Sequence, residues 1–208
     1  MPEISIKAEH LFTFLGLDIT NSLALAFITS AILIILGVLF KKTLALIPGK
    51  IQNFIEFAFE EMLSLCNSVL NNEEKTEKYF PLVATIFFFV LVSNWLGLIP
   101  GIGSVGIYEP GGEAHALIPL FRAPAADLNF TLAIALIAVI GVNIFGIMAV
   151  GILPHIKKFI NFSSPIGFFI GILEFIGEFA RIISFSFRLF GNVFAGEVLL
   201  IIMAFLLP

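Results

Sequence analysis

The sequence has little charge and almost no cysteine. Charged residues make up 12% of its 208 positions, compared with about 25% in soluble globular domains. Cys66 is the single cysteine, so the chain forms no internal disulfide and offers no cysteine pair to a metal. It has no basic cluster suited to nucleic acid and no glycine-rich phosphate loop of the form GxxxxGK(S/T). We therefore expect no nucleic-acid binding and no nucleotide, cofactor or metal site in this chain.

In place of charge, the sequence has long apolar runs. Hydrophobic residues make up 59% of it, and its mean hydropathy is +1.08. A helix needs about 20 apolar residues to cross the hydrocarbon core of a membrane. Three uncharged runs predict spans at about 19–40, 79–100 and 128–153, and a fourth apolar region, which does carry charges, covers about 165–208. We predict an all-α membrane protein, a multi-span helical bundle that forms one domain over residues 1–208.

The distribution of Lys and Arg predicts the orientation of this bundle. Seven lysines lie between the first two spans or just after the third, namely Lys41, Lys42, Lys50, Lys75, Lys78, Lys157 and Lys158. In the loops on the opposite side there are only Lys7 and Arg122. Because cytoplasmic loops carry the excess of Lys and Arg, we predict an N-terminus outside the membrane, a cytoplasmic 41–78 connection and an outer loop at 101–126.

The 41–78 connection contains a predicted amphipathic helix. Apolar residues recur at helical spacing from Ile51 to Val69, with acidic and amide side chains on the other face. We expect this helix to lie at the inner membrane interface. Its polar face is acidic, so contact with lipid and contact with a partner subunit both remain open. Asn71–Lys78 is predicted as a solvated turn, with Pro81 and Pro100 at the ends of the second span.

The fourth apolar region carries polar residues that a membrane helix normally avoids. They are Glu174, Glu178, Arg181, Arg188, Asn192 and Glu197. An arginine at the centre of a bilayer helix costs about 2.5–3.5 kcal/mol on insertion scales, and its guanidinium stays protonated at physiological pH. Arg188 is therefore predicted to be a functional residue, and the predicted cargo is an ion. Snorkelling of Arg188, or a structural ion pair with a glutamate, is the alternative.

One continuous helix over 168–206 would sort these residues by face. At 100° per residue, Arg181 lies about 20° from Arg188, while Glu174, Asn192 and Ser184 lie within about 40°. Glu178 is about 80° away and Glu197 about 180° away. One polar stripe thus ends near Arg188, and a second acidic position lies on the opposite face. This pattern predicts two separate wet pockets at different depths, with a fixed cation between them.

Several of these residues also have a simpler structural interpretation. Asn192 can hydrogen-bond a neighbouring helix, and Glu174 and Glu178 can be solvated near the inner interface. Arg181 can pair with either glutamate at helical spacing, which makes structural support its expected role. Asp127 directly precedes a predicted helix, so it is expected to act as an N-cap, a role compatible with one in an ion pathway.

Three segments carry a resemblance to a known family. Ser184–Glu197 reads SFSFRLFGNVFAGE, Pro124–Leu132 reads PAADLNFTL, and Asn94–Gly101 reads NWLGLIPG. They resemble subunit a of the F-type ATP synthase, over roughly Pro81 to Pro208. The resemblance implies a stator subunit of the membrane Fo sector, held against a rotating ring of c subunits, with the b subunits and membrane lipid as further partners. It implies a multi-pass protein of a bacterial inner (plasma) membrane that translocates H⁺, with Na⁺ also possible.

The resemblance also implies roles for single residues. Arg188 matches the essential arginine that faces the ring carboxylates. Asn192 and Glu197 match polar residues of the outer half-channel, and Asp127 matches an acidic position near its mouth. Glu174 matches a carboxylate of the inner half-channel. The predicted ion pathway also includes Ser184, with Arg181 and Glu178 in supporting positions.

Three further expectations concern the chain as a whole. The family continues past the AGE motif with another membrane helix, so we expect the sequence ending at Pro208 to be truncated. The chain contains no predicted nucleotide or hydrolytic site, which leaves its own status as an enzyme open. A self-contained secondary ion transporter or channel is the alternative function, although the internal repeats common in transporters are not apparent. A purely structural membrane scaffold would leave Arg188 and Glu197 unexplained.

Overall fold

The computed structural model describes residues 8–14, 16–99, 106–108, 117–159 and 165–206. Four of its helices are long and apolar enough to cross a membrane. These are α1 (Asn21–Thr43), α3 (Glu73–Gly97), α4 (Leu128–Val150) and α6 (Pro165–Leu206). Large apolar side chains along these helices are exposed, while the buried positions are mostly small residues. The predicted all-α, multi-span membrane fold is confirmed.

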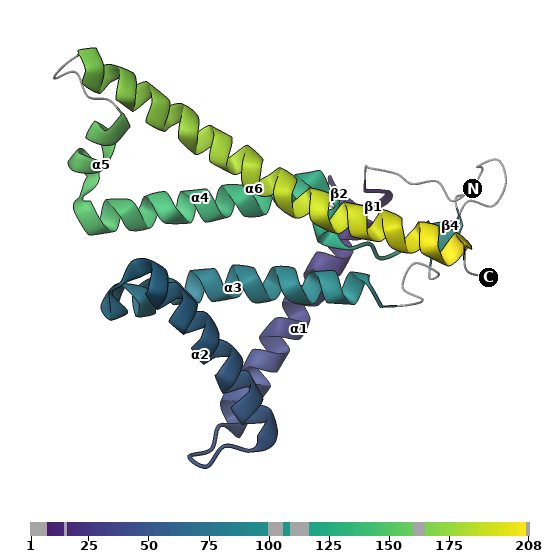
Figure 1. Ribbon diagram of the computed structural model, residues 1–208. Helices are drawn as coiled ribbons and strands as arrows, with labels where there is room; N and C mark the ends of the chain where they lie inside the picture. The colour runs from purple at the N-terminus through teal and green to yellow at the C-terminus, as the bar shows by residue number, and fades with distance from the viewer. Residues whose placement is uncertain (1–7, 15, 100–105, 109–116, 160–164, 207–208) are drawn as a thin grey trace.

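Helix α6 is much longer than a membrane is thick. It has 42 residues, which at 1.5 Å per residue make about 63 Å, roughly twice the hydrocarbon core of about 30 Å. The helix lies beside α4 at one end and diverges from it toward the other, where α5 (Ile152–Phe159) joins the two (Figure 1). A helix of this length fits a membrane only if it is strongly tilted or extends beyond it.

The helices meet at a short 3₁₀ helix, η2 (Pro124–Ala126), which contacts α1, α3, α4 and α6. Residues 122–127 are buried without interruption. Gly97 allows the close approach of α3, because a Cβ atom there would lie 2.6 Å from the Cβ of Ala123. We call this part of the molecule the η2 end and the opposite part the α5 end.

Two short antiparallel hairpins, not predicted from the sequence, lie at the η2 end (Figure 1). Strand β1 (His10–Phe14) pairs with β2 (Leu17–Thr20), and β3 (Gly106–Tyr108) pairs with β4 (Leu117–Pro119). Asn21 links the first hairpin to the outer-loop segment: its Oδ1 accepts from the backbone of Glu9 at 3.3 Å, and its Nδ2 donates to the carbonyl of Pro119 at 3.3 Å. Such contacts join segments far apart in sequence, so local patterns do not predict them.

Helix α3 begins earlier than predicted. The expected turn Asn71–Lys78 is confined to Asn71 and Asn72, and Asn71 has φ 47°. The side chain of Asn72 accepts a hydrogen bond from the backbone N–H of Lys75 at 3.0 Å. This N-cap starts the helix at Glu73, so Pro81 lies inside the helix rather than at its start. Pro100 lies outside the described residues, and the helix ends at Gly97.

The third span ends earlier than the predicted 128–153. Helix α4 stops at Val150 because Gly151 has φ +94°, and α5 starts directly after it. Helix α5 then folds back, and His155 Nε2 lies 3.1 Å from Asn143 Oδ1. A Cβ atom at Gly146 would lie 2.8 Å from the His155 ring, so a larger residue there would require the ring to shift.

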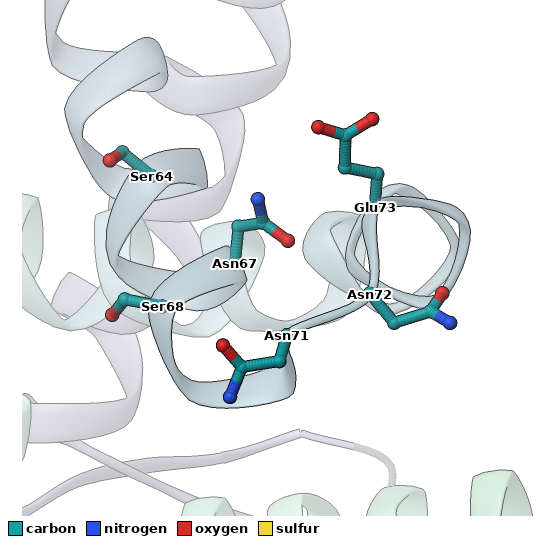
Figure 2. Close-up of a pocket in the computed structure, with 6 residues that line it drawn as sticks. All are labelled: Ser64, Asn67, Ser68, Asn71, Asn72 and Glu73. Atoms are coloured by element: carbon teal, nitrogen blue, oxygen red, sulfur yellow. The ribbon is translucent and has the colours of Figure 1, made fainter.

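The predicted amphipathic helix is confirmed as α2 (Lys50–Leu70), which contacts α3. Phe59 contacts the ring of Phe88 at a centroid distance of 4.9 Å, while Ile51 and Val69 remain exposed. Polar side chains surround a shallow hollow at the turn into α3 (Figure 2). Helix α2 thus leaves part of its apolar surface uncovered, as expected for a helix at a membrane interface.

Candidate ion-translocation site

Helix α6 packs through one defined face. Ser186 is fully buried, and its hydroxyl lies 3.1 Å from the hydroxyl of Thr131 on α4. Glu197 lies about 20° from Ser186 around the helix, and it contacts the segment before η2. The face that contains Ser186 and Glu197 therefore turns toward α4 and η2.

Arg188 lies on the opposite face and is exposed. Its guanidinium carbon is 5.8 Å from the centre of the Phe185 ring, a distance that permits a cation–π contact. Among the residues that the structure describes, Arg188 makes no ion pair. Ser184 and Asn192 are also exposed. Arg188, Ser184 and Asn192 thus share one face of α6 and are exposed in the described chain.

Glu197 has a partner that the sequence analysis missed. Arg122 Nε lies 3.4 Å from both carboxylate oxygens of Glu197, and Arg122 Nη2 lies 3.5 Å from Oε2. The Arg122 side chain is 8% exposed and that of Glu197 is 29% exposed. Arg122 was predicted only as an outer-loop residue. The signal that could have revealed its role is its position, two residues before the PAADLNFTL motif.

Asp127 forms the N-cap of α4. Its side-chain oxygen accepts a hydrogen bond from the backbone N–H of Asn129 at 3.0 Å, and the residue is 7% exposed. This confirms the capping role expected from the sequence. Asp127 directly follows η2, so it lies in the same buried segment as Arg122.

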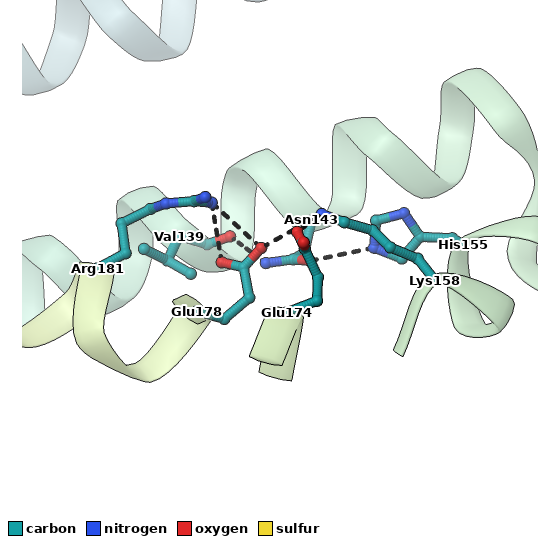
Figure 3. A network of polar contacts seen from close by, with 7 residues as sticks. All are labelled: Val139, Asn143, His155, Lys158, Glu174, Glu178 and Arg181. Atoms are coloured by element: carbon teal, nitrogen blue, oxygen red, sulfur yellow. Dashed lines mark hydrogen bonds and ion pairs between the residues drawn. The ribbon is translucent and has the colours of Figure 1, made fainter. Parts of the chain in front are cut away.

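A second charged cluster lies at the α5 end (Figure 3). Lys158 on α5 forms an ion pair with Glu174 and lies 3.8 Å from Glu178. Arg181 Nη1 donates to both carboxylate oxygens of Glu178, at 3.0 and 3.1 Å. The expected pairing of Arg181 with a glutamate is therefore present, whereas the contribution of Lys158 was not predicted. Beside the cluster, Asn143 Nδ2 donates to the Val139 carbonyl at 2.9 Å.

The two acidic groups and Arg188 occupy three different depths along α6. At 1.5 Å per residue, Glu174 lies about 21 Å from Arg188 in one direction and Glu197 about 14 Å in the other. Carboxylates can take up and release cations, whereas a guanidinium keeps its positive charge and repels them. The arrangement can therefore hold cations at two places while opposing their direct passage between them. Within the described residues, no group of three or more His, Cys, Asp or Glu side chains could hold a metal ion.

Comparison with known proteins shows which family this chain is similar to. The family model described as "ATP synthase A chain" matches residues 23–208. The chain is 34% identical to "ATP synthase subunit a" of Helicobacter hepaticus over 207 residues, which covers 96% of this chain and 81% of the relative. It is 35% identical to the protein of the same name from Geotalea daltonii, with coverage of 96% and 79%, and 34% identical to that of Campylobacter hominis, with coverage of 86% and 70%.

Proposed function

We propose a function for this chain, which belongs to the family of ATP synthase A chains. It is the stator subunit of the Fo sector. It passes ions between two offset half-channels and the carboxylates of a rotating ring of c subunits. Membership of the family does not by itself assign a role to any single residue of this chain. The contacts of α6 support the roles of its residues.

The observation that carries the proposal is the exposed face around Arg188. A permanent charge within an apolar helix needs a partner, because leaving it in hydrocarbon is costly. The described part of the chain offers Arg188 no ion-pair partner. A carboxylate on an adjoining c subunit would supply one whenever it is ionised. It could leave Arg188 only after binding an ion, which neutralises it.

The two charged sites then correspond to the two half-channels. Glu197, held by Arg122, lies at the η2 end, and Glu174 and Glu178, held by Lys158, lie at the α5 end. An ion that arrives at one site cannot pass Arg188 directly, so it must bind to the ring and travel with it. This is the coupling that a rotary motor requires. Asn192 and Ser184, on the same exposed face as Arg188, would line the path to the ring.

The distribution of the lysines supports one orientation of the chain in the membrane. Lys41 and Lys42 end α1, Lys50 begins α2, and Lys157 and Lys158 lie in α5, whereas Arg122 lies at the η2 end. This excess of basic residues supports a cytoplasmic α5 end and an external η2 end. We place the N-terminus outside a bacterial inner membrane, with c and b subunits and lipid as the surrounding partners.

A cross-linking experiment tests the contact between α6 and the ring. In the intact complex carrying Cys66→Ser, a photoreactive thiol reagent is attached to a cysteine that replaces Asn192. Asn192 lies about 40° from Arg188 around the helix, so the reagent is expected to capture a c subunit. The matched control is Ile183→Cys, because Ile183 is 56% exposed and lies about 140° from Arg188. Equal capture of c subunits from both positions, or capture only from position 183, would contradict the proposal.

A further inference from the structure

Helix α5 has an exposed face that combines apolar side chains with one lysine. Leu153 is 72% exposed and Ile156 is 51% exposed, and Lys157 beside them is exposed as well. We propose that this face binds an anionic phospholipid: the two apolar side chains lie among its acyl chains, and the Lys157 ammonium binds the phosphate of its headgroup. The inference does not depend on the proposed function, since it requires only that α4 crosses a membrane.

The exposed face of α5 lies opposite the face that packs on the rest of the chain. His155 Nε2 lies 3.1 Å from Asn143 Oδ1 on α4, and Lys158 forms an ion pair with a glutamate of α6. At 100° per residue, Lys158 lies about 60° from His155 around the helix. Leu153 and Lys157 each lie about 160° from His155. The contacts of one face thus fix the rotation of α5 and turn the other face away from α4.

The position of α5 along α4 places this face at the membrane boundary. Helix α4 has 23 residues, which make about 35 Å, slightly more than the hydrocarbon core of about 30 Å. His155 packs against Gly146 and Asn143, about 6 and 10 Å before the end of α4. Helix α5 runs from there toward α6 (Figure 1). An interfacial helix buries its apolar face about 5–10 Å below the headgroups, which is this depth.

The charges around α5 leave Lys157 in excess. Lys158 pairs with Glu174, and Arg181 pairs with Glu178, so each carboxylate of the cluster at the α5 end has a cation. Lys157 forms no ion pair within the described ranges of the chain. A lysine at a membrane surface attracts anionic lipid. Its alkyl stem can follow the apolar surface while the ammonium reaches the headgroups.

An anionic phospholipid satisfies both parts of this face. Its acyl chains cover Leu153 and Ile156, which a free phosphate ion would leave in water. Its phosphate supplies the negative charge that Lys157 lacks within the chain. A zwitterionic headgroup carries its own ammonium, which competes with Lys157 for the phosphate, whereas a headgroup such as phosphatidylglycerol does not. The site should therefore prefer the anionic lipid.

The test measures which lipids lie next to α5 in the intact complex. In a Cys66→Ser background, a fluorophore is attached to a cysteine that replaces Ile152, which is 62% exposed and leaves Leu153, Ile156 and Lys157 in place. The complex is reconstituted into phosphatidylcholine vesicles that contain a small share of either phosphatidylglycerol or phosphatidylcholine with a nitroxide quencher at the top of the acyl chain. The labelled phosphatidylglycerol should quench the fluorophore more strongly.

Variants of the lysine then test its part in this preference. Lys157→Gln should lower the preference for phosphatidylglycerol about fivefold, the factor expected for one basic residue near the membrane surface. Lys157→Arg should retain it. The matched control is Lys75→Gln, which removes the same charge from an exposed position in the first turn of α3, beside Glu73 and Glu74. It should leave the preference unchanged.

Several results would overturn the inference. They are equal quenching by both lipids with Lys157 present, an unchanged preference in Lys157→Gln, and an equal fall in Lys75→Gln, which would show a general effect of charge. Quenching by neither lipid would also overturn it, because water or a protein partner would then cover the face. If Ile152→Cys does not assemble, a fluorophore on Leu153→Cys gives the same comparison.

Discussion

Single side chains on α6 differ in chemistry according to the face on which they lie. Ser186 and Glu197, on the covered face, have partners on other elements, Thr131 and Arg122. Arg188 and Asn192, on the uncovered face, point away from the described chain. A polar residue in an apolar helix requires a partner, so we propose that the uncovered residues are the ones that depend on another subunit.

The buried hydroxyls of Thr131 and Ser186 are expected to stabilise the packing of α6 against α4. Thr131→Val removes the partner of Ser186, which is fully buried, and should destabilise the subunit by about 1–3 kcal/mol because a polar group is left unsatisfied. The thermal midpoint of the detergent-solubilised complex should fall. The double variant Thr131→Val with Ser186→Ala should recover much of the loss. Ser184→Ala, at an exposed position two residues away, serves as the control. A double variant less stable than Thr131→Val alone would contradict this account of the contact.

At the scale of elements, the turn between α4 and α5 brings Lys158 to Glu174 and Glu178. The turn depends on Gly151, whose φ of 94° and ψ of 162° define a conformation that is almost restricted to glycine. Without this turn, α4 would continue as the straight span predicted from the sequence. The cluster at the α5 end is therefore a consequence of one backbone conformation.

Gly151→Ala should consequently destabilise the subunit by about 1–3 kcal/mol, the strain of placing a side chain in this conformation. It should also weaken the contact of Lys158 with the two glutamates. The measurement is the thermal midpoint of the solubilised complex. The matched substitution is Gly177→Ala in α6, where a Cβ atom would meet nothing within 4 Å and where alanine favours the helix. Equal loss of stability in both variants would show that the turn conformation is not the cause.

For the whole molecule, the sequence predicts the helices better than the contacts between them. Hydropathy predicted where the four long apolar helices lie, although α3 begins at Glu73 rather than at 79, and the helical period placed Arg188 and Glu197 on opposite faces of α6. Boundaries were missed where one side chain or one glycine decides them, at Asn72 and Gly151. The hydropathy of a long apolar run does not show such local features.

The partners of Glu197 and Glu174 on other elements could not be predicted from the sequence for a different reason. Arg122 and Glu197 are 75 positions apart, and Lys158 reaches Glu174 only because α5 folds back. Pairing at such separations is decided by tertiary packing, which periodicity within one helix does not report. The motifs around Arg188 indicated which helix matters, whereas the counter-ions of its carboxylates became visible only in the fold.

We propose that Arg188 couples ion movement to the ring by keeping two charged sites apart, and removal of its side chain is the sharpest test of this role. In the reconstituted complex, Arg188→Ala should abolish ATP-driven ion pumping and leave the passive ion leak unchanged or raised, because the fixed positive charge between the sites is gone. Arg181→Ala is the control, since Arg181 is paired with Glu178 on the same helix, and it should retain measurable pumping. Normal pumping by Arg188→Ala would contradict the account.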